Sequence, residues 1–218
     1  MLKPNYGQAV IFPVPDEMDP AVARVLFSSV HGFSQIGISQ TAISLIVNYS
    51  HDDWQLDANR REEYLSERIS QLYALVDSLG EVPILFAGII NSYSIKVDCA
   101  DESILSALQG EFLCDGDPDL LDLIVKFTHK FDQRFFSNTM IQNYREWGGE
   151  PPNEGIRVPY GTAVSRGVTV THDFNDRLAF NEEPRYFSEQ AVGREILSAS
   201  NAALEPTLNR IMRAFDAV

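Results

Sequence analysis

Histidine is the side chain best suited to acid–base chemistry near neutral pH, and His172 has the most informative surroundings of the four in this sequence. It alternates with Val168, Val170 and Phe174, which places it on the apolar side of a predicted strand. A catalytic base needs a carboxylate to orient it, but the adjacent Asp173 points to the opposite face. We therefore expect His172 to be a hydrogen-bonded core residue, and we assign no catalytic residue.

A second candidate is His51-Asp52-Asp53, which follows the end of a predicted strand, where binding loops often occur. Imidazole and carboxylate groups can hold a divalent metal. However, adjacent residues rarely converge on one ion, and no second histidine is near in the sequence. A polar turn is the simpler interpretation of this segment.

Residues 115–119 (Asp-Gly-Asp-Pro-Asp) resemble the opening of a calcium-binding loop. The pattern then fails, because Leu120 stands where the loop needs Gly and Lys126 stands where it needs Glu. The sequence also lacks nucleotide-binding glycine loops and the Cys or His spacing of zinc sites. We therefore predict neither a metal site nor a cofactor.

The most distinctive feature is an acidic run. No Lys or Arg occurs between Val97 and Val125, although this stretch contains eight carboxylates and the whole chain has a net charge of -14. Such a charge disfavours nucleic acid and anionic membranes, and it favours a basic protein partner. An ordinary solvated face is the alternative. The predicted partner-binding residues are Asp101, Glu102, Glu111, Asp115, Asp117, Asp119 and Asp122.

The elements that must position these acids are two predicted helices. The first spans 101–113. Asp117-Pro118 then opens a long helix, because Asp caps free amides and Pro suits the first helical position. Its apolar face consists of Leu120, Ile124, Phe127 and Phe131, and its basic face of Lys126, Lys130 and Arg134. We expect it to break near Ser137-Asn138 and to resume as far as Trp147.

Elsewhere, strands are predicted from period-two alternation and helices from apolar residues three and four apart. The predicted strands are 8–14, a hairpin over 36–49, 84–90 followed by a turn at Asn91-Ser92, 93–97, 156–164 and 168–174, the last two joined at 165–167. Three other helices are predicted. The first follows Asp19-Pro20 and has Val22, Val25, Leu26 and Ser29 on one face; the second spans 59–79; the third runs from 185 and has a kink at Pro206.

These elements predict an α+β protein in which helices pack on an antiparallel or mixed sheet. The N-terminal part has the βαββαβ order of a ferredoxin-like fold, and the remainder could be an incomplete second copy. We expect a single domain over 1–218, with a possible subdivision near 91–100 and a loop at 147–155.

The cysteines bear on the cellular compartment. A helix over 101–113 holds Cys99 and Cys114 about 18 Å apart, and a disulfide needs Cα atoms within roughly 7 Å. Two free thiols suit a reducing cytoplasm, and the sequence has neither a signal-peptide pattern nor an apolar membrane span. We therefore expect a cytoplasmic protein.

Three functions are consistent with this sequence. The first is a non-catalytic binding protein whose acidic surface engages a basic protein, as an immunity protein or antitoxin does. The second is a small cofactor-free enzyme with a pocket near the strand ends that uses His51 or His172. The third is a self-associating subunit that pairs through Phe127, Phe131, Phe135 and Phe136. The first is our hypothesis, because no catalytic set of residues accompanies the concentrated negative charge.

Overall fold

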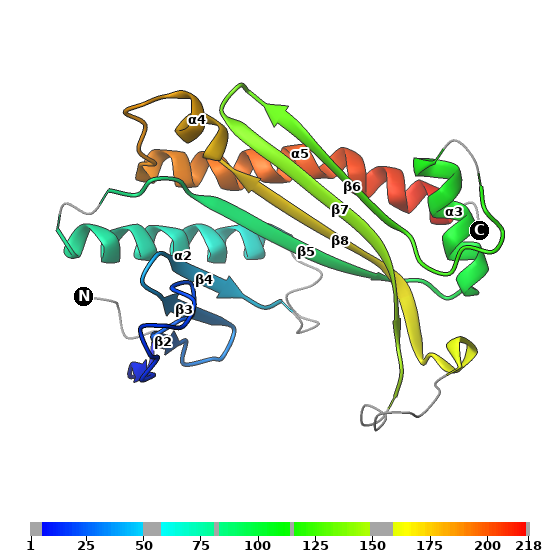
Figure 1. Cartoon of the computed structure of the whole chain (residues 1–218), viewed down its shortest axis with the longest axis horizontal. Coiled ribbons are helices and arrows are strands. Elements are labelled where there is room, and N and C mark those ends of the chain that lie inside the picture. The colour runs from blue at the N-terminus through cyan, green and yellow to red at the C-terminus, as the bar shows by residue number, and fades with distance from the viewer. Residues whose placement is uncertain (1–5, 50–57, 81–82, 114–115, 149–158, 217–218) are drawn as a thin grey trace. The chain divides into compact units, whose positions relative to one another are not determined.

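The protein is described from a computed structural model, shown in Figure 1. The structure describes residues 6–49, 58–80, 83–113, 116–148 and 159–216. The chain divides into two compact units, residues 1–83 and 84–218, and each contains its own antiparallel sheet and at least one helix. The predicted α+β class is therefore confirmed.

Unit 1, residues 1–83, contains a sheet in which neighbours along the chain are neighbours in the sheet. Its strands are β1 (Val10–Ile11), β2 (Val25–Ser28), β3 (Ser34–Ile38) and β4 (Ile43–Val47). The predicted hairpin is confirmed, because Ile38 pairs with Ile43 beside the turn between β3 and β4. The alternation along β3 leaves Ile36 with no exposed surface.

The helix predicted after Asp19-Pro20 is wrong, because this segment turns and then enters β2. Asp19 Oδ1 accepts a hydrogen bond from the Ala21 amide over 2.9 Å, which stabilises a local turn as readily as a helix start. Val25 and Phe27 then pair with β3, as β-branched and aromatic residues favour. The ferredoxin-like order is not confirmed, since it requires a helix between its first two strands.

The predicted helix over 59–79 is confirmed as α2 (Ala58–Ser78). It ends before Gly80, whose φ of 95° lies in the left-handed region that favours glycine. α2 packs on β4. Within the described part of unit 1, Ile36, Tyr73 and Val76 are the buried hydrophobic residues, so the core of this unit is small.

Unit 2, residues 84–218, is built on a longer antiparallel sheet with the order β5-β8-β7-β6. Its strands are β5 (Gly88–Lys96), β6 (Ile124–Phe131), β7 (Phe135–Glu146) and β8 (Ser165–Asn175). β5 and β6 are the edges of this sheet. Lys126 and Lys130 are exposed on edge strand β6.

The long helix predicted from Asp117-Pro118 to Trp147 is also wrong, because this stretch is the hairpin of β6 and β7. Phe127, Phe131 and Phe135 are four residues apart, a spacing that suits one face of a helix and, because it is even, one face of a strand as well. The connection between the strands, residues 132–134, contains Asp132 and Gln133, both with positive φ, as the central residues of a type I′ turn require, and the Arg134 amide donates to the Phe131 carbonyl over 3.2 Å. The predicted basic helix face is therefore absent.

Two strand boundaries also differ from the prediction. β5 runs unbroken through Asn91-Ser92, where a turn was predicted, because its whole length pairs with β8. Residues 84–87 precede it and form no strand. β8 includes Ser165–Gly167, which was predicted to be a connection. The strand predicted over 156–164 is wrong in its described part, because residues 159–164 contain the short 3-10 helix η1 (Tyr160–Thr162) and no strand. The possible subdivision near 91–100 stays a prediction, and most of the predicted loop at 147–155 lies outside the described residues.

Helices cover one face of the unit 2 sheet, as Figure 1 shows for α5. They are α3 (Asp101–Phe112), as predicted, α4 (Arg177–Glu182) and α5 (Gln190–Asp216), which continues through Pro206. One apolar cluster joins Ile104 and Leu108 of α3 to Val170 of β8 and Leu204 of α5. A second cluster joins Phe135 and Phe174 to Val192 and Ile196 of α5. Among the helices described, none is long and apolar enough to cross a membrane.

Candidate functional site

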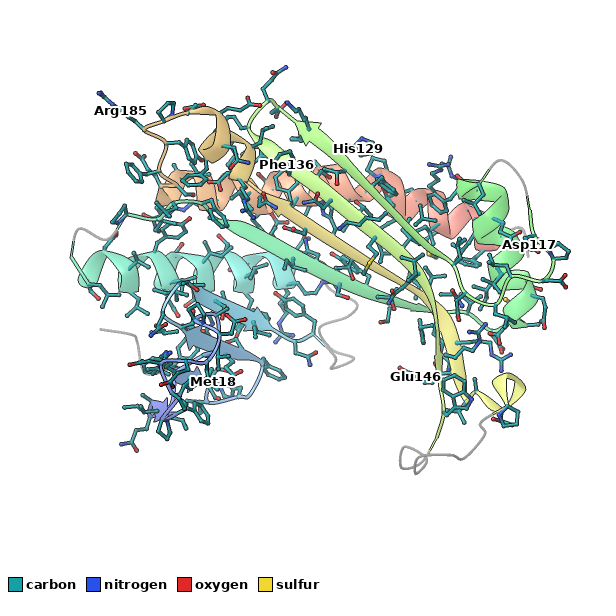
Figure 2. The ribbon with its side chains drawn as sticks, viewed as in Figure 1. Met18, Asp117, His129, Phe136, Glu146 and Arg185 are labelled. Atoms are coloured by element: carbon teal, nitrogen blue, oxygen red, sulfur yellow. The ribbon has the colours of Figure 1, made fainter. Side chains whose placement is uncertain are left out.

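The predicted acidic residues gather around α3 and the segment that follows it. Asp101 and Glu102 lie in the first turn of α3, and Glu111 lies in its last turn. Asp117, Asp119 and Asp122 follow between α3 and β6, and Figure 2 labels Asp117 there. Asp115 lies outside the described residues.

Arg145 of β7 neutralises two of these acids. Its Nε donates to Asp101 Oδ2 over 2.9 Å, its Nη1 donates to Asp122 Oδ1 over 2.7 Å, and its Nη2 donates to the Leu121 carbonyl. The side chain of Arg145 is only 5% exposed. Burial works against its charge, but the hydrogen bonds to both carboxylates outweigh burial and raise the pKa of Arg145. This arginine ties the start of α3 and the loop before β6 to the sheet.

Glu111 is also paired. Its carboxylate and its backbone carbonyl both accept hydrogen bonds from Arg210 of α5, and the same guanidinium lies over the Phe112 ring. Arg166 of β8 contributes a further charge, because its Nε is 3.7 Å from Asp101 Oδ1. Asp101, Glu111 and Asp122 are therefore parts of intramolecular ion pairs.

The open acidic surface, as we call it, consists of Glu102, Asp117 and Asp119. All three are exposed, and none forms an ion pair with another described residue. Gln109, whose side chain contacts Asp117, lies seven residues after Glu102 in α3, which is about 10 Å along the helix axis. The open acidic surface therefore covers roughly two turns of helix and the adjoining loop.

Gln109 holds the loop part of this surface in place. Its buried amide donates to the Asp117 carbonyl over 2.9 Å and accepts from the Asp117 amide over 2.8 Å. Asp117 Oδ1 in turn accepts from the Asp119 amide over 3.0 Å. The two contacts to Gln109 hold the Asp117 main chain against α3, and the local turn orients the Asp117 carboxylate and positions the Asp119 backbone. No sequence pattern had indicated this role for Gln109, because its partner groups are main-chain atoms.

His172 is a core residue, as predicted, and has no exposed surface. Its Nε2 lies 2.9 Å from Ser137 Oγ of β7 and its Nδ1 lies 3.4 Å from Ser200 Oγ of α5. Asn91 of β5 completes the cluster by donating to Ser200 Oγ over 3.0 Å. Burial lowers the pKa of His172, opposed by the nearby Asp173 carboxylate. A serine within reach of a histidine can form a nucleophile, but a substrate cannot reach this buried pair.

The predicted His51-Asp52-Asp53 site lies outside the described residues. Where the structure describes the chain, no group of three or more His, Cys, Asp or Glu side chains is placed to hold a metal ion. Cys99 is a half-buried free thiol whose pKa is raised by burial, while Cys114 is another residue that the structure leaves undescribed.

A buried carboxylate missed by the sequence reasoning lies at the other end of the unit 2 sheet. Asp176, directly after β8, has no exposed surface and accepts from the Ala87 amide over 2.8 Å and the Tyr186 hydroxyl over 2.7 Å. Burial, together with the Asp176 contact, raises the pKa of Tyr186 to about 12. Arg134 binds both Glu195 oxygens nearby. These contacts fix the segments before β5 and after α4, which is a structural role.

The aromatic residues proposed for self-association mostly belong to the core. Phe135 is fully buried and stacks on Phe174, with ring centroids 5.0 Å apart. Phe127 and Phe131 pack against the two apolar clusters. Phe136 follows Phe135 directly in β7, so it is on the other face of the sheet, and it is half-buried. Core packing accounts for three of these four residues.

Comparison with models of protein families, with curated proteins and with solved structures finds no match for this chain.

Proposed function

We propose that the protein is a non-catalytic binding protein, acting in the cytoplasm, whose open acidic surface engages a basic protein and neutralises it in the manner of an immunity protein or antitoxin. The observation that carries this proposal is the pair of hydrogen bonds between the Gln109 side chain and the Asp117 backbone. Gln109 holds the Asp117 main chain against α3, the helix that also carries Glu102, and Asp119 follows in a turn closed by Asp117. None of the three carboxylates has a cationic partner among the described residues.

Fixed charges suit this role for two reasons. Groups that are already ordered lose less conformational entropy on binding than groups on a mobile tail. In addition, an uncompensated charge cluster attracts an oppositely charged partner over several ångströms, which accelerates encounter. The paired acids Asp101, Glu111 and Asp122 contribute less, because Arg145 and Arg210 already neutralise them.

The enzymatic alternative loses support at His172, since its ring is enclosed between the sheet and α5. Self-association through the aromatic residues loses support because Phe135 is in the core. We therefore retain the binding function and restrict its surface to fewer residues than the sequence indicated.

The test is a triple variant in which Glu102→Gln, Asp117→Asn and Asp119→Asn are combined. The matched control changes Glu62→Gln, Glu63→Gln and Asp77→Asn on exposed positions of α2, which alters the net charge equally. Association with an octalysine peptide, and with a basic protein captured from the native host, is measured at low and high salt. We expect the triple variant to associate roughly tenfold more slowly at low salt and the control to match the wild type.

Salt should abolish most of this difference, because the Debye length falls from about 10 Å at 0.1 M to about 3 Å at 1 M. Equal slowing by the triple variant and its control would show that only net charge matters. That result would remove the open acidic surface as a specific site.

A further inference from the structure

Unit 1 contains a buried arginine that no described carboxylate neutralises. Arg68 of α2 is 6% exposed, and the ion pairs formed among the described residues do not include it. Its Nη1 donates to Gln71 Oε1 over 2.9 Å, but its Nε is buried without a hydrogen-bond acceptor. A buried cation with an unused donor is costly unless something else satisfies it.

Two tyrosines fix the orientation of this guanidinium. Its central carbon lies 4.6 Å from the ring centre of Tyr64 and 5.2 Å from that of Tyr6. Tyr64 precedes Arg68 by one helical turn, and the bridge between Tyr6 and Ser29 brings Tyr6 to the sheet. Attraction between the cation and the rings offsets part of the burial cost, but it uses the guanidinium face and leaves the in-plane N–H groups available.

The two tyrosines whose rings face Arg68 carry hydroxyls that are linked through Ser34. Ser34 Oγ lies 3.2 Å from the Tyr6 hydroxyl and 2.9 Å from the Tyr64 hydroxyl, so the three form one hydrogen-bonded chain. Ser34 is buried and both tyrosines are half-buried, so the tyrosines are the part of this cluster that meets solvent. The nearest link to an acid is indirect, because Gln71 Nε2 donates to the exposed Glu67 over 2.9 Å.

We propose that Arg68, Tyr6, Tyr64 and Ser34 form a binding site for an oxyanion, either a phosphate or a carboxylate group. The Nε edge of a guanidinium matches two oxygens of such a group, and hydroxyls donate well to anionic oxygen. A bound oxyanion supplies both the missing acceptor and the missing counter-charge. This site is independent of the open acidic surface, since all of its residues belong to unit 1.

The test uses the full-length protein and observes Arg68 directly. The Nε–H resonance of Arg68 is identified by nuclear magnetic resonance from its loss in Arg68→Lys. Inorganic phosphate and acetate are then titrated separately at constant ionic strength, with sodium chloride as the compensating salt. We expect at least one of them to shift this resonance saturably. Saturation with only phosphate or only acetate identifies which oxyanion the site takes.

The variants separate the site from general charge effects. Arg68→Lys keeps the charge but lacks the planar guanidinium with its parallel N–H donors, so we expect at least tenfold weaker binding. Binding to this variant is followed through the amide resonances around Ser34. Arg60→Gln on the same helix removes one positive charge at an exposed position and should bind as the wild type does. If Arg68→Lys fails to fold, Tyr64→Phe replaces it and should weaken binding several-fold.

Two results would overturn the proposal. One is a resonance that neither anion shifts beyond the effect of chloride. The other is equal affinity in the wild type and in the Arg68→Lys or Tyr64→Phe variant.

Discussion

Arg145 Nε donates a 2.9 Å hydrogen bond to Asp101 Oδ2, and this contact joins the sheet of unit 2 to the first turn of α3. Both side chains are largely buried, at 5% and 15% exposure. The pair places Asp101 among the groups that hold the fold together, although the sequence had indicated a surface role for it.

Replacing Asp101 with Asn should therefore destabilise the protein. The change leaves a buried guanidinium short of a charged acceptor, and we expect the free energy of unfolding to fall by about 1–3 kcal/mol. Urea unfolding measures this. Asp119→Asn, at an exposed position, should change stability by no more than about 0.5 kcal/mol, and similar losses in both variants would contradict the assignment.

His172 should make the fold sensitive to acid. Burial lowers its pKa in the folded state, so below the ordinary value near 6.5 the unfolded chain binds a proton that the folded chain does not. Stability contributed by neutral His172 is therefore lost as the pH falls below that value, by at most about 1.4 kcal/mol per pH unit. Urea unfolding between pH 7.5 and 5 should show a shallower acid dependence in His172→Gln than in His129→Gln. Identical dependences would argue against the buried histidine.

Tyr186 should produce the opposite behaviour at alkaline pH. Its folded-state pKa of about 12 exceeds the ordinary value of 10.0, so the unfolded chain loses this proton first. Stability should fall between pH 10 and pH 12, and Tyr186→Phe should flatten that part of the curve. The same change removes the hydroxyl donor to buried Asp176, with a loss of about 1–3 kcal/mol at neutral pH. If every tyrosine of the folded protein titrated near pH 10, that result would count against the Asp176 contact.

We predict that the two units unfold together, as the single domain expected from the sequence. Unit 1 has few buried apolar residues, and a core of that size gives little independent stability. Scanning calorimetry should show one transition whose calorimetric and van't Hoff enthalpies agree. Two separated transitions would show that residues 1–83 and 84–218 are independent domains.

The sequence predicted elements whose pattern admitted one interpretation. The hairpin around Ile38 and Ile43 has strict alternation, and α2 has an apolar stripe that ends before Gly80. The β6–β7 hairpin could not be predicted in the same way, because its phenylalanines are spaced four apart, and that spacing fits a helix and a strand equally well. The Asp-Pro pairs wrongly predicted helix starts for a related reason, since aspartate stabilises turns and helix starts by the same hydrogen bond.

The candidate surface was only partly predictable, because the arginines that neutralise it are remote in the sequence. Arg145 is 44 residues from Asp101, and Arg210 is 99 residues from Glu111. A local count of charges therefore overstates the free negative charge around α3. By contrast, the burial of His172 followed from its immediate neighbours, whose alternation defines one face of β8.

The exposed lysines of β6 also affect how the protein behaves when it is concentrated. An edge strand presents unpaired main-chain groups on which a strand of another molecule can add, and repeated addition gives a fibrous aggregate. Lys126 and Lys130 would bring like charges together if two β6 edges met. Polymerisation through this edge is therefore opposed at neutral pH, and replacing both lysines with apolar residues should make the protein prone to precipitate.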